Sequence, residues 1–178
     1  IIVSGNNIKK TPDYRKQIDY LPQIANFPSN LRVRELIKMI KDLRGKTERE
    51  IQLIERFALK QYLDKKLGNL SGGTKQKVNL LLTFMFDSSI LILDEPTTGL
   101  DPLALIQLKE LIEEEKQKGK TILITSHIMS FVEEMTDEIV FLLEGNIYFK
   151  GAIQQLKDDT KQNDLEHAIA ALLEKNNV

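Results

Sequence analysis

The spacing of apolar and polar residues predicts two short strands near the start of the chain. They cover Ile1–Val3 and Ile18–Leu21. A polar stretch separates them, and in it Asn6-Asn7 and Pro12 signal turns. Pro22-Gln23 ends the second strand.

Three helices are predicted in the block that follows. The first has an apolar stripe at helical spacing, formed by Val33, Leu36, Ile37 and Ile40. Gly45 stands where a C-capping glycine is expected, and Thr47 with Glu50 has the spacing of a capping box that opens the second helix. The third helix begins at Ser71. Its apolar stripe consists of Val78, Leu81, Leu82, Met85 and Phe86.

The second half of the chain alternates between strands and helices. Ile90–Leu93 and Ile122–Ile124 are continuous apolar runs, which predict strands buried on both faces. Between them, Asp101-Pro102 supplies an N-cap and a first-turn proline for a helix that runs to Gly119. This alternation predicts a parallel sheet and the α/β class.

A hairpin and one more helix are predicted after the parallel strands. The hairpin pairs Ile139–Leu143 with Ile147–Phe149 across Gly145-Asn146. The tail from Asn163 has the pattern of an amphipathic helix, expected over about 163–175.

The composition is that of one soluble globular domain that can bury a core. The chain has 178 residues, of which 42% are apolar. Its 25 lysines and arginines nearly balance 26 aspartates and glutamates, which argues against nucleic acid as a partner. The absence of cysteine excludes disulfides, thiolate metal sites and a cysteine nucleophile. Because the sequence shows neither a bilayer-length apolar run nor a signal peptide, we expect a cytoplasmic protein.

Two carboxylates, Asp94 and Glu95, directly follow the predicted strand Ile90–Leu93. Open α/β sheets bind ligands at this carboxyl end of their strands. Adjacent residues of an extended strand point to opposite sides, so one acid is suited to holding Mg²⁺ and the other to orienting a water for phosphoryl transfer. Taken alone, the pair is equally compatible with a solvated strand end.

Ser71-Gly72-Gly73 is a candidate anion-binding helix start. Serine is a favoured N-cap, and the two glycines leave the backbone open to close approach. By itself the triplet is more often an ordinary capped loop. Gly68 and Gly73 also have the glycine spacing of a P-loop, but Thr74-Lys75 follows in place of Lys-Ser/Thr and no predicted strand precedes them. We therefore reject a Walker A motif here.

Five motifs resemble those of the ATP-binding cassette (ABC) ATPases and stand in that family's order. Leu70–Gln76 resembles the signature motif, and Ile90–Glu95 resembles the Walker B strand. Tyr20–Gln23 is similar to the Q-loop, Thr98–Asp101 to the D-loop, and Ile124–His127 to the switch strand with its histidine. Because the five together cover most of the chain, the resemblance outweighs the ordinary interpretation of each motif alone.

The resemblance implies catalytic roles for four residues. Asp94 is implied to bind Mg²⁺, and Glu95 to act as the general base. Gln23 is implied to contact Mg²⁺ and the attacking water, and His127 to clamp the γ-phosphate.

Four further residues are implied to act between two subunits. Ser71, Gly72 and Gly73 are implied to hold the γ-phosphate of an ATP that a second subunit binds for the most part. Asp101 is implied to bridge the two subunits.

The resemblance also implies a fold and an incomplete site. The fold is a P-loop NTPase-like, mostly parallel sheet with an inserted helical subdomain at about 27–86, and residues 1–178 form a partial ABC ATPase domain whose N-terminal part is missing. In the family, the Walker A loop and the aromatic residue that stacks on adenine belong before Ile1. We therefore expect the 178-residue chain neither to bind ATP appreciably nor to hydrolyse it. We also expect it to self-associate through strand surface that the missing part covers.

For the parent protein, the resemblance implies the ATP-binding and ATP-hydrolysing subunit of an ABC transporter. ATP and Mg²⁺ are the implied cofactors. The implied partners are a separate transmembrane permease and a second nucleotide-binding subunit in a homodimer, on the inner face of the cell membrane. Two alternatives stay open: a soluble ABC ATPase of DNA repair or translation, and a non-enzymatic fragment. The helical block is short and lacks sustained heptads, which favours the transporter.

Overall fold

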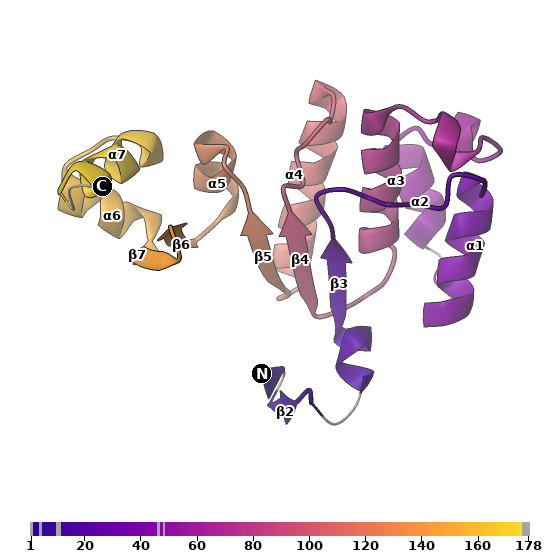
Figure 1. Ribbon diagram of the computed structural model, residues 1–178, viewed down its shortest axis with the longest axis horizontal. Coiled ribbons are helices and arrows are strands. Elements are labelled where there is room, and N and C mark those ends of the chain that lie inside the picture. The colour runs from indigo at the N-terminus through magenta and orange to yellow at the C-terminus, as the bar shows by residue number, and fades with distance from the viewer. Residues whose placement is uncertain (1, 4, 10–11, 46, 48, 176–178) are drawn as a thin grey trace. The chain divides into compact units, whose positions relative to one another are not determined.

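The computed structural model describes residues 2–3, 5–9, 12–45, 47 and 49–175, and the chain forms two compact units, Ile1–Thr125 and Ser126–Val178 (Figure 1). The strands of the first unit are β1 (Ile2–Val3), β2 (Asn6–Asn7), β3 (Ile18–Leu21), β4 (Ile90–Asp94) and β5 (Thr121–Thr125). Its α-helices are α1 (Val33–Arg44), α2 (Arg49–Arg56), α3 (Gly72–Phe84) and α4 (Pro102–Gln117). Its 3-10 helices are η1 (Asp13–Gln17), η2 (Lys60–Tyr62) and η3 (Leu67–Asn69).

The second unit contains a strand pair and three helices. Its elements are α5 (Met129–Met135), β6 (Glu138–Leu143), β7 (Asn146–Ala152), α6 (Ile153–Thr160) and α7 (Leu165–Lys175). They enclose a small apolar core formed by Ile139, Ile153, Leu156, Leu165, Ala168 and Ile169. Across the described parts of both units, no helix combines the length and the apolar character needed to cross a bilayer.

A parallel three-stranded sheet, in the order β3-β4-β5, forms the centre of the first unit (Figure 1). Its register pairs Leu21 with Leu93 and Leu93 with Ile124, so all three strands reach their carboxyl ends at one edge. The predicted α/β class and parallel sheet are confirmed.

One face of this sheet is buried and the other is open. Leu91 and Leu93 are at most 1% exposed on the face where α3 contacts β3 and α4 contacts β5. On the opposite face Tyr20, Ile92 and Leu123 are paired in register, and Tyr20 and Leu123 are 54% and 57% exposed. The prediction that these strands are buried on both faces is therefore wrong, because the described helices that contact them cover one side.

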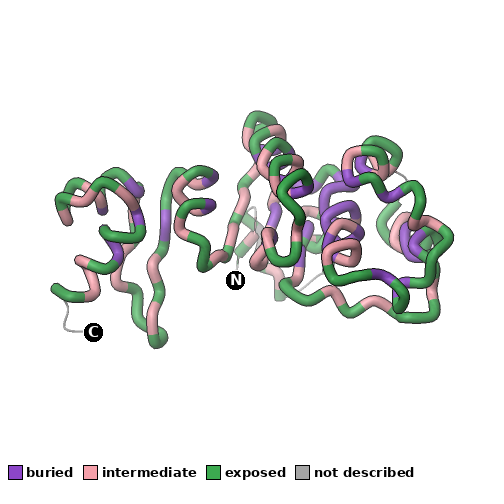
Figure 2. Tube along the Cα trace, turned by 90° about the horizontal axis from the view of Figure 1, so that it is seen from above, coloured by how far each residue is buried: buried purple, intermediate pink, exposed green. Residues whose placement is uncertain are grey.

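The helix α3 is the most deeply buried helix of this unit, as the colouring of Figure 2 shows. It begins where predicted, with Ser71 Oγ accepting a hydrogen bond from the Thr74 N–H at 3.3 Å. The helix α4 likewise begins at Asp101, whose Oδ1 accepts from the Ala104 N–H at 2.9 Å. Both predicted N-caps are confirmed, since each side chain satisfies a backbone donor of a first helical turn.

Two turn predictions are wrong. Asn6-Asn7 forms β2 and pairs with β1, and Gly5, at a φ of +78°, lies in the reversal between them. The β6–β7 hairpin turns at Glu144-Gly145, with φ values of +48° and +79°, while Asn146 pairs with Leu143. This pair of positive φ values matches the twist of a two-residue hairpin.

The predicted capping box of Thr47 and Glu50 does not form. The Thr47 hydroxyl accepts from the Arg49 N–H at 3.2 Å and donates to the Met85 carbonyl at 2.6 Å. The Glu50 carboxylate instead pairs with Lys41 of α1. Both side chains therefore serve contacts with other elements, which local spacing does not reveal.

Candidate active site

Asp94 is the last residue of β4 and is half-buried at the carboxyl edge of the sheet. The Thr125 hydroxyl, at the end of β5, donates to its Oδ1. The Tyr20 hydroxyl, from β3, lies 3.5 Å from its Oδ2. Side chains from all three strands thus meet at this carboxylate.

Glu95 leaves the strand in a left-handed backbone conformation, with a φ of +46°. Its N–H donates to the Thr125 carbonyl at 3.0 Å and lies 3.3 Å from the Thr125 hydroxyl. Non-glycine residues rarely adopt this conformation, and such strain is common at functional sites. The expectation that Asp94 and Glu95 alternate as neighbours in an extended strand is therefore corrected, because Glu95 lies beyond the end of β4 in a turn.

Gln23 lies at the same edge, two residues after β3 ends at Leu21. Leu21 pairs with Leu93 in the parallel register, so Gln23 and Glu95 each lie two residues beyond this pair. Gln23 is exposed. The structure therefore places Gln23 in an exposed segment just after β3, the strand that neighbours β4.

Ser71 and Gly72 are exposed at the start of α3, and Gly73 is half-buried against the loop between β4 and α4. A Cβ at Gly73 would lie 2.6 Å from the Gly99 carbonyl oxygen. The signature residues are therefore held against the predicted D-loop by direct backbone contact.

Asp101 has two partners within this chain. It caps α4, and its Oδ2 lies 2.6 Å from Lys77 Nζ of α3. The hydrogen bond from Lys77, together with the Ala104 N–H, lowers the pKa of the Asp101 carboxyl. The carboxylate is therefore charged at neutral pH and ties α4 to α3.

His127 belongs to the second unit, where it is exposed just before α5. The neighbouring Ser126 Oγ accepts from the Ile128 N–H at 3.1 Å, which shapes the turn into that helix. The other seven predicted site residues all lie in the first unit.

The donors at the sheet edge suit Mg²⁺ bound together with a nucleotide. Carboxylate, hydroxyl and amide oxygens are the ligands that Mg²⁺ prefers, and it usually keeps waters and substrate phosphates beside one or two carboxylates. The described residues contain no group of three or more His, Cys, Asp or Glu side chains that could hold a metal by themselves. Asp94 is thus a fitting single carboxylate ligand.

Two residues at this edge had no predicted role, although both lie in motifs that resemble those of the family. Thr125 and Tyr20 both contact the Asp94 carboxylate, and Thr125 also holds the Glu95 backbone. A polar residue directly after the apolar run Ile122–Ile124 was the available signal, since parallel register brings strand ends together.

Comparison with known proteins identifies the class of molecule. The sequence profile of the family described as ABC transporter matches residues 1–98. A solved structure titled "Structure of ATP binding subunit of ABC transporter" superimposes with a TM-score of 0.88 at 29% identity, over 96% of this chain and 75% of that one. The chain belongs to the ABC transporter family.

The relatives are ATP-binding components of transporters by name. The ABC transporter ATP-binding protein NatA of Bacillus subtilis is 33% identical over 121 residues, which are 68% of this chain and 49% of that protein. The Nod factor export ATP-binding protein I of Burkholderia orbicola is 34% identical over 143 residues, 78% of this chain and 47% of that protein. EcsA of Bacillus subtilis is 27% identical over 92% of this chain and 69% of its own length. The chain spans about half the length of the first curated relatives that it matches.

Proposed function

We propose that this chain is part of an ATP-hydrolysing subunit of an ABC transporter, which couples ATP turnover to substrate movement by a separate membrane permease. The observation that carries the proposal is the carboxyl end of β4. There Thr125 contacts the Asp94 carboxylate and the Glu95 backbone, and Gln23 lies two residues beyond the end of the neighbouring strand β3. The alternative of DNA repair or translation gains no support from relatives that are named as transporter components.

The proposed chemistry assigns separate tasks to the two carboxylates. Glu95 accepts the proton of the attacking water, and Gln23 orients that water. Asp94 holds Mg²⁺, which when bound neutralises charge on the phosphates. Charge stabilisation and positioning supply most of phosphoryl-transfer catalysis, so a rigid sheet edge is a suitable base for these groups.

The start of α3 is proposed to serve a nucleotide on a second, identical subunit. Ser71 and Gly72 are exposed, and the first turn of a helix offers N–H groups and positive dipole charge to an anion. Asp101 then lies near the contact between subunits, and His127 clamps the γ-phosphate. We therefore expect a dimer that closes on ATP.

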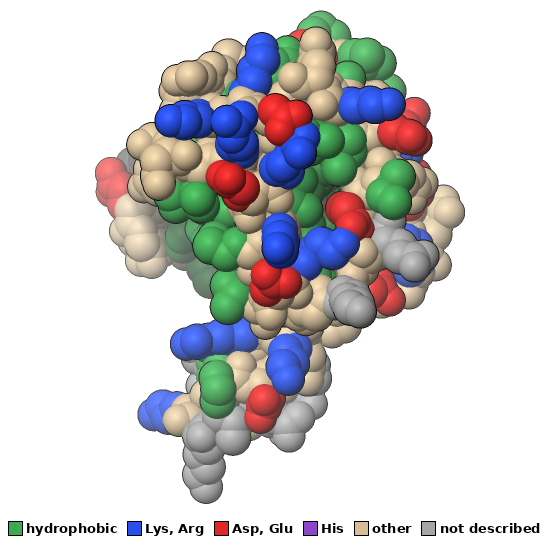
Figure 3. Space-filling model, turned by 90° about the vertical axis from the view of Figure 1, so that its right-hand side faces the viewer, with side chains coloured by type: hydrophobic (Ala, Val, Ile, Leu, Met, Phe, Trp, Pro, Cys, Tyr) green, Lys and Arg blue, Asp and Glu red, His purple; other side chains and the backbone are tan. Residues whose placement is uncertain are grey.

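Residues 27–86 are proposed to form the helical subdomain that docks on the permease. A groove of about 1030 Å³ runs between α1 and α2 there, and Figure 3 shows charged side chains around apolar ones on this side of the molecule. Arg34, Lys38 and Lys41 of α1 line the groove together with Asp42, and Arg34 and Lys41 are paired with Asp64 and Glu50. Ile51 on α2 is 62% exposed. This surface suits a short amphipathic helix of the permease.

Two measurements on the full gene product test the proposal. Purified protein should hydrolyse ATP in the presence of Mg²⁺ and stop when Mg²⁺ is chelated; failure to bind or turn over Mg-ATP would contradict the function. Ile51→Glu should weaken co-purification with the permease. The matched control is Ile106→Glu on α4, which is 54% exposed and does not line the groove, and it should retain the permease.

A further inference from the structure

Two amide side chains are buried on α3, beyond the turn that carries Ser71-Gly72-Gly73. Gln76 is 6% exposed and Asn79 is 4% exposed. Burying an amide destabilises the fold unless its polar atoms find partners. The positions of their partners therefore show what these two residues do.

Both amides reach out of the helix to the segments that follow β3 and β4. Asn79 Nδ2 donates to the Pro22 carbonyl at 3.0 Å, and Gln76 Nε2 donates to the Pro96 carbonyl at 3.2 Å. Asn79 Nδ2 also lies 3.4 Å from Gln76 Oε1, which links the two amides. Pro22 immediately precedes Gln23, and Pro96 immediately follows Glu95.

We infer that Asn79 and Gln76 are positioning residues, which fix the segments carrying Gln23 and Glu95 to the helix that carries the signature residues. The inference rests on the proposed ATPase function. The segments that carry Gln23, Glu95 and the signature residues are far apart in sequence. Side chains of a single buried helix connect them, which explains how their relative positions are fixed. Neither residue needs to touch the nucleotide.

A third buried polar residue on α3 shows that burial alone does not make such a connection. Thr83 is also 4% exposed, but its hydroxyl donates to the Asn79 carbonyl at 3.0 Å, within its own helix. Thr83 therefore provides a matched control. Thr83→Val removes a buried hydrogen bond from the same helix and leaves both loop contacts intact.

The kinetic test uses the full gene product with Asn79→Leu, a change that keeps most of the side-chain volume. A misplacement of about 1 Å can reduce a rate by about a hundredfold. We expect kcat for ATP hydrolysis to fall about 10- to 100-fold, with KM for ATP changed less than about threefold, because the contact sets geometry and not affinity. Thr83→Val should retain kcat within about threefold. Equal kcat values for Asn79→Leu and Thr83→Val would overturn the inference.

Hydrogen–deuterium exchange on the same proteins tests the anchoring directly. Peptides that contain Gln23 should exchange faster in Asn79→Leu than in wild type. In Thr83→Val their exchange rate should equal that of wild type. Asn79→Ala and Gln76→Leu repeat the test if Asn79→Leu does not fold, and the Gln76 variant should loosen the segment after Glu95. Unchanged exchange in the folded variants would overturn the inference. If wild-type protein lacks ATPase activity, the proposed function fails, while the exchange experiment still decides whether the anchor exists.

Discussion

Gly73 packs so closely on Gly99 that a Cβ at position 73 would lie 2.6 Å from the Gly99 carbonyl oxygen. Gly99 itself has a φ of +73°, a backbone conformation that favours glycine. The start of α3 and the loop before α4 therefore meet without an intervening side chain. The close approach requires glycine at position 73, and the backbone conformation favours glycine at position 99.

Replacement of Gly73 by alanine should therefore destabilise the chain. Overpacking of this kind typically costs about 1–3 kcal/mol, and backbone atoms cannot move aside as a flexible side chain can. Gly72→Ala is the control, since no atom lies within 4 Å of a Cβ built there. Urea denaturation should show a lower midpoint for Gly73→Ala only. A shared midpoint for the two variants would show that the contact is not tight.

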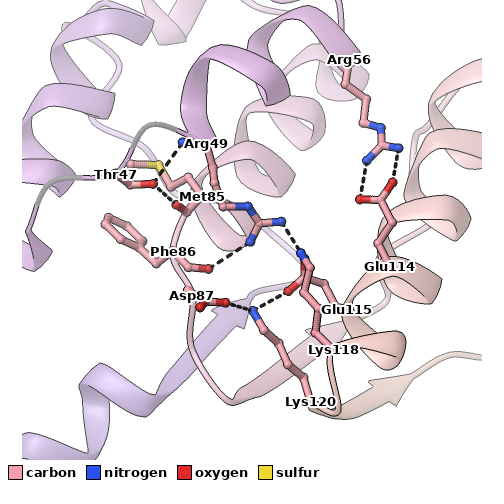
Figure 4. Close-up of polar contacts among 10 residues, drawn as sticks. All are labelled: Thr47, Arg49, Arg56, Met85, Phe86, Asp87, Glu114, Glu115, Lys118 and Lys120. Atoms are coloured by element: carbon pink, nitrogen blue, oxygen red, sulfur yellow. Dashed lines mark hydrogen bonds and ion pairs between the residues drawn. The ribbon is translucent and has the colours of Figure 1, made fainter.

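Glu115 of α4 is the centre of a charge network that joins α2, α4 and the start of β5 (Figure 4). Its side chain is fully buried. Arg49 Nη2 lies 2.6 Å and Lys118 Nζ 2.8 Å from its Oε1, and Lys120 pairs with its Oε2. Burial raises the pKa of the Glu115 carboxyl, but the hydrogen bonds from Lys118, Lys120 and Arg49 outweigh it and lower the pKa to about 2.

This depressed pKa predicts acid sensitivity. The Glu115 contribution to the unfolding free energy is fully present above the ordinary carboxyl pKa of 4.5 and is lost as the pH falls through about 2. The loss should amount to about 3 kcal/mol. Burial raises the pKa of the Asp19 carboxyl, so protonation of Asp19 favours the folded state as the pH falls. The experiment must therefore isolate the contribution of Glu115.

The measurement is the unfolding free energy from urea denaturation between pH 5 and pH 2. Wild type should lose stability over this range more steeply than Glu115→Gln, which has no proton to take up. Parallel pH profiles for the two proteins would show that Glu115 does not carry the effect.

Ser71→Arg in the full gene product should prevent ATP-dependent dimerisation. A long cation at the start of α3 fills the space where the anion of the second subunit is proposed to bind. Size-exclusion chromatography with ATP, on a Glu95→Gln background that keeps ATP intact, should show monomer. Ser89→Arg is the matched control, because Ser89 is an exposed serine just before the amino end of β4, whereas the candidate site lies at its carboxyl end. A dimer peak for Ser71→Arg would contradict the shared site.

Short sequence motifs predicted where helices begin. The exposure of strands and the backbone conformation at the site depend on tertiary contacts, which such motifs do not show. Ser71 and Asp101 were correctly predicted as N-caps because capping depends on residues within one turn. The exposure of Leu123 does not follow from the apolar run Ile122–Ile124 alone, since such a run does not show whether another element covers it. The left-handed turn at Glu95 also leaves no sequence signal, and the Thr125 contacts that accompany it come from the neighbouring strand.

In the candidate site, too, some residues were predictable from the sequence and others only from their contacts. The motif residues Gln23, Ser71, Asp94 and Glu95 were identified by type and order, and their proposed roles stay predictions. Asn79 was not identified, because a polar residue in a helical pattern gives no indication that it reaches a loop 57 residues earlier in the sequence.

The central claim is that Glu95 is the base of an ATPase, and its replacement by glutamine tests this most directly. The amide keeps the shape of the side chain but cannot accept the proton of the attacking water. Steady-state ATP hydrolysis by the full gene product should fall by about a hundred- to ten-thousandfold, while ATP binding is retained. Turnover of Glu95→Gln within a few-fold of wild type would contradict the account.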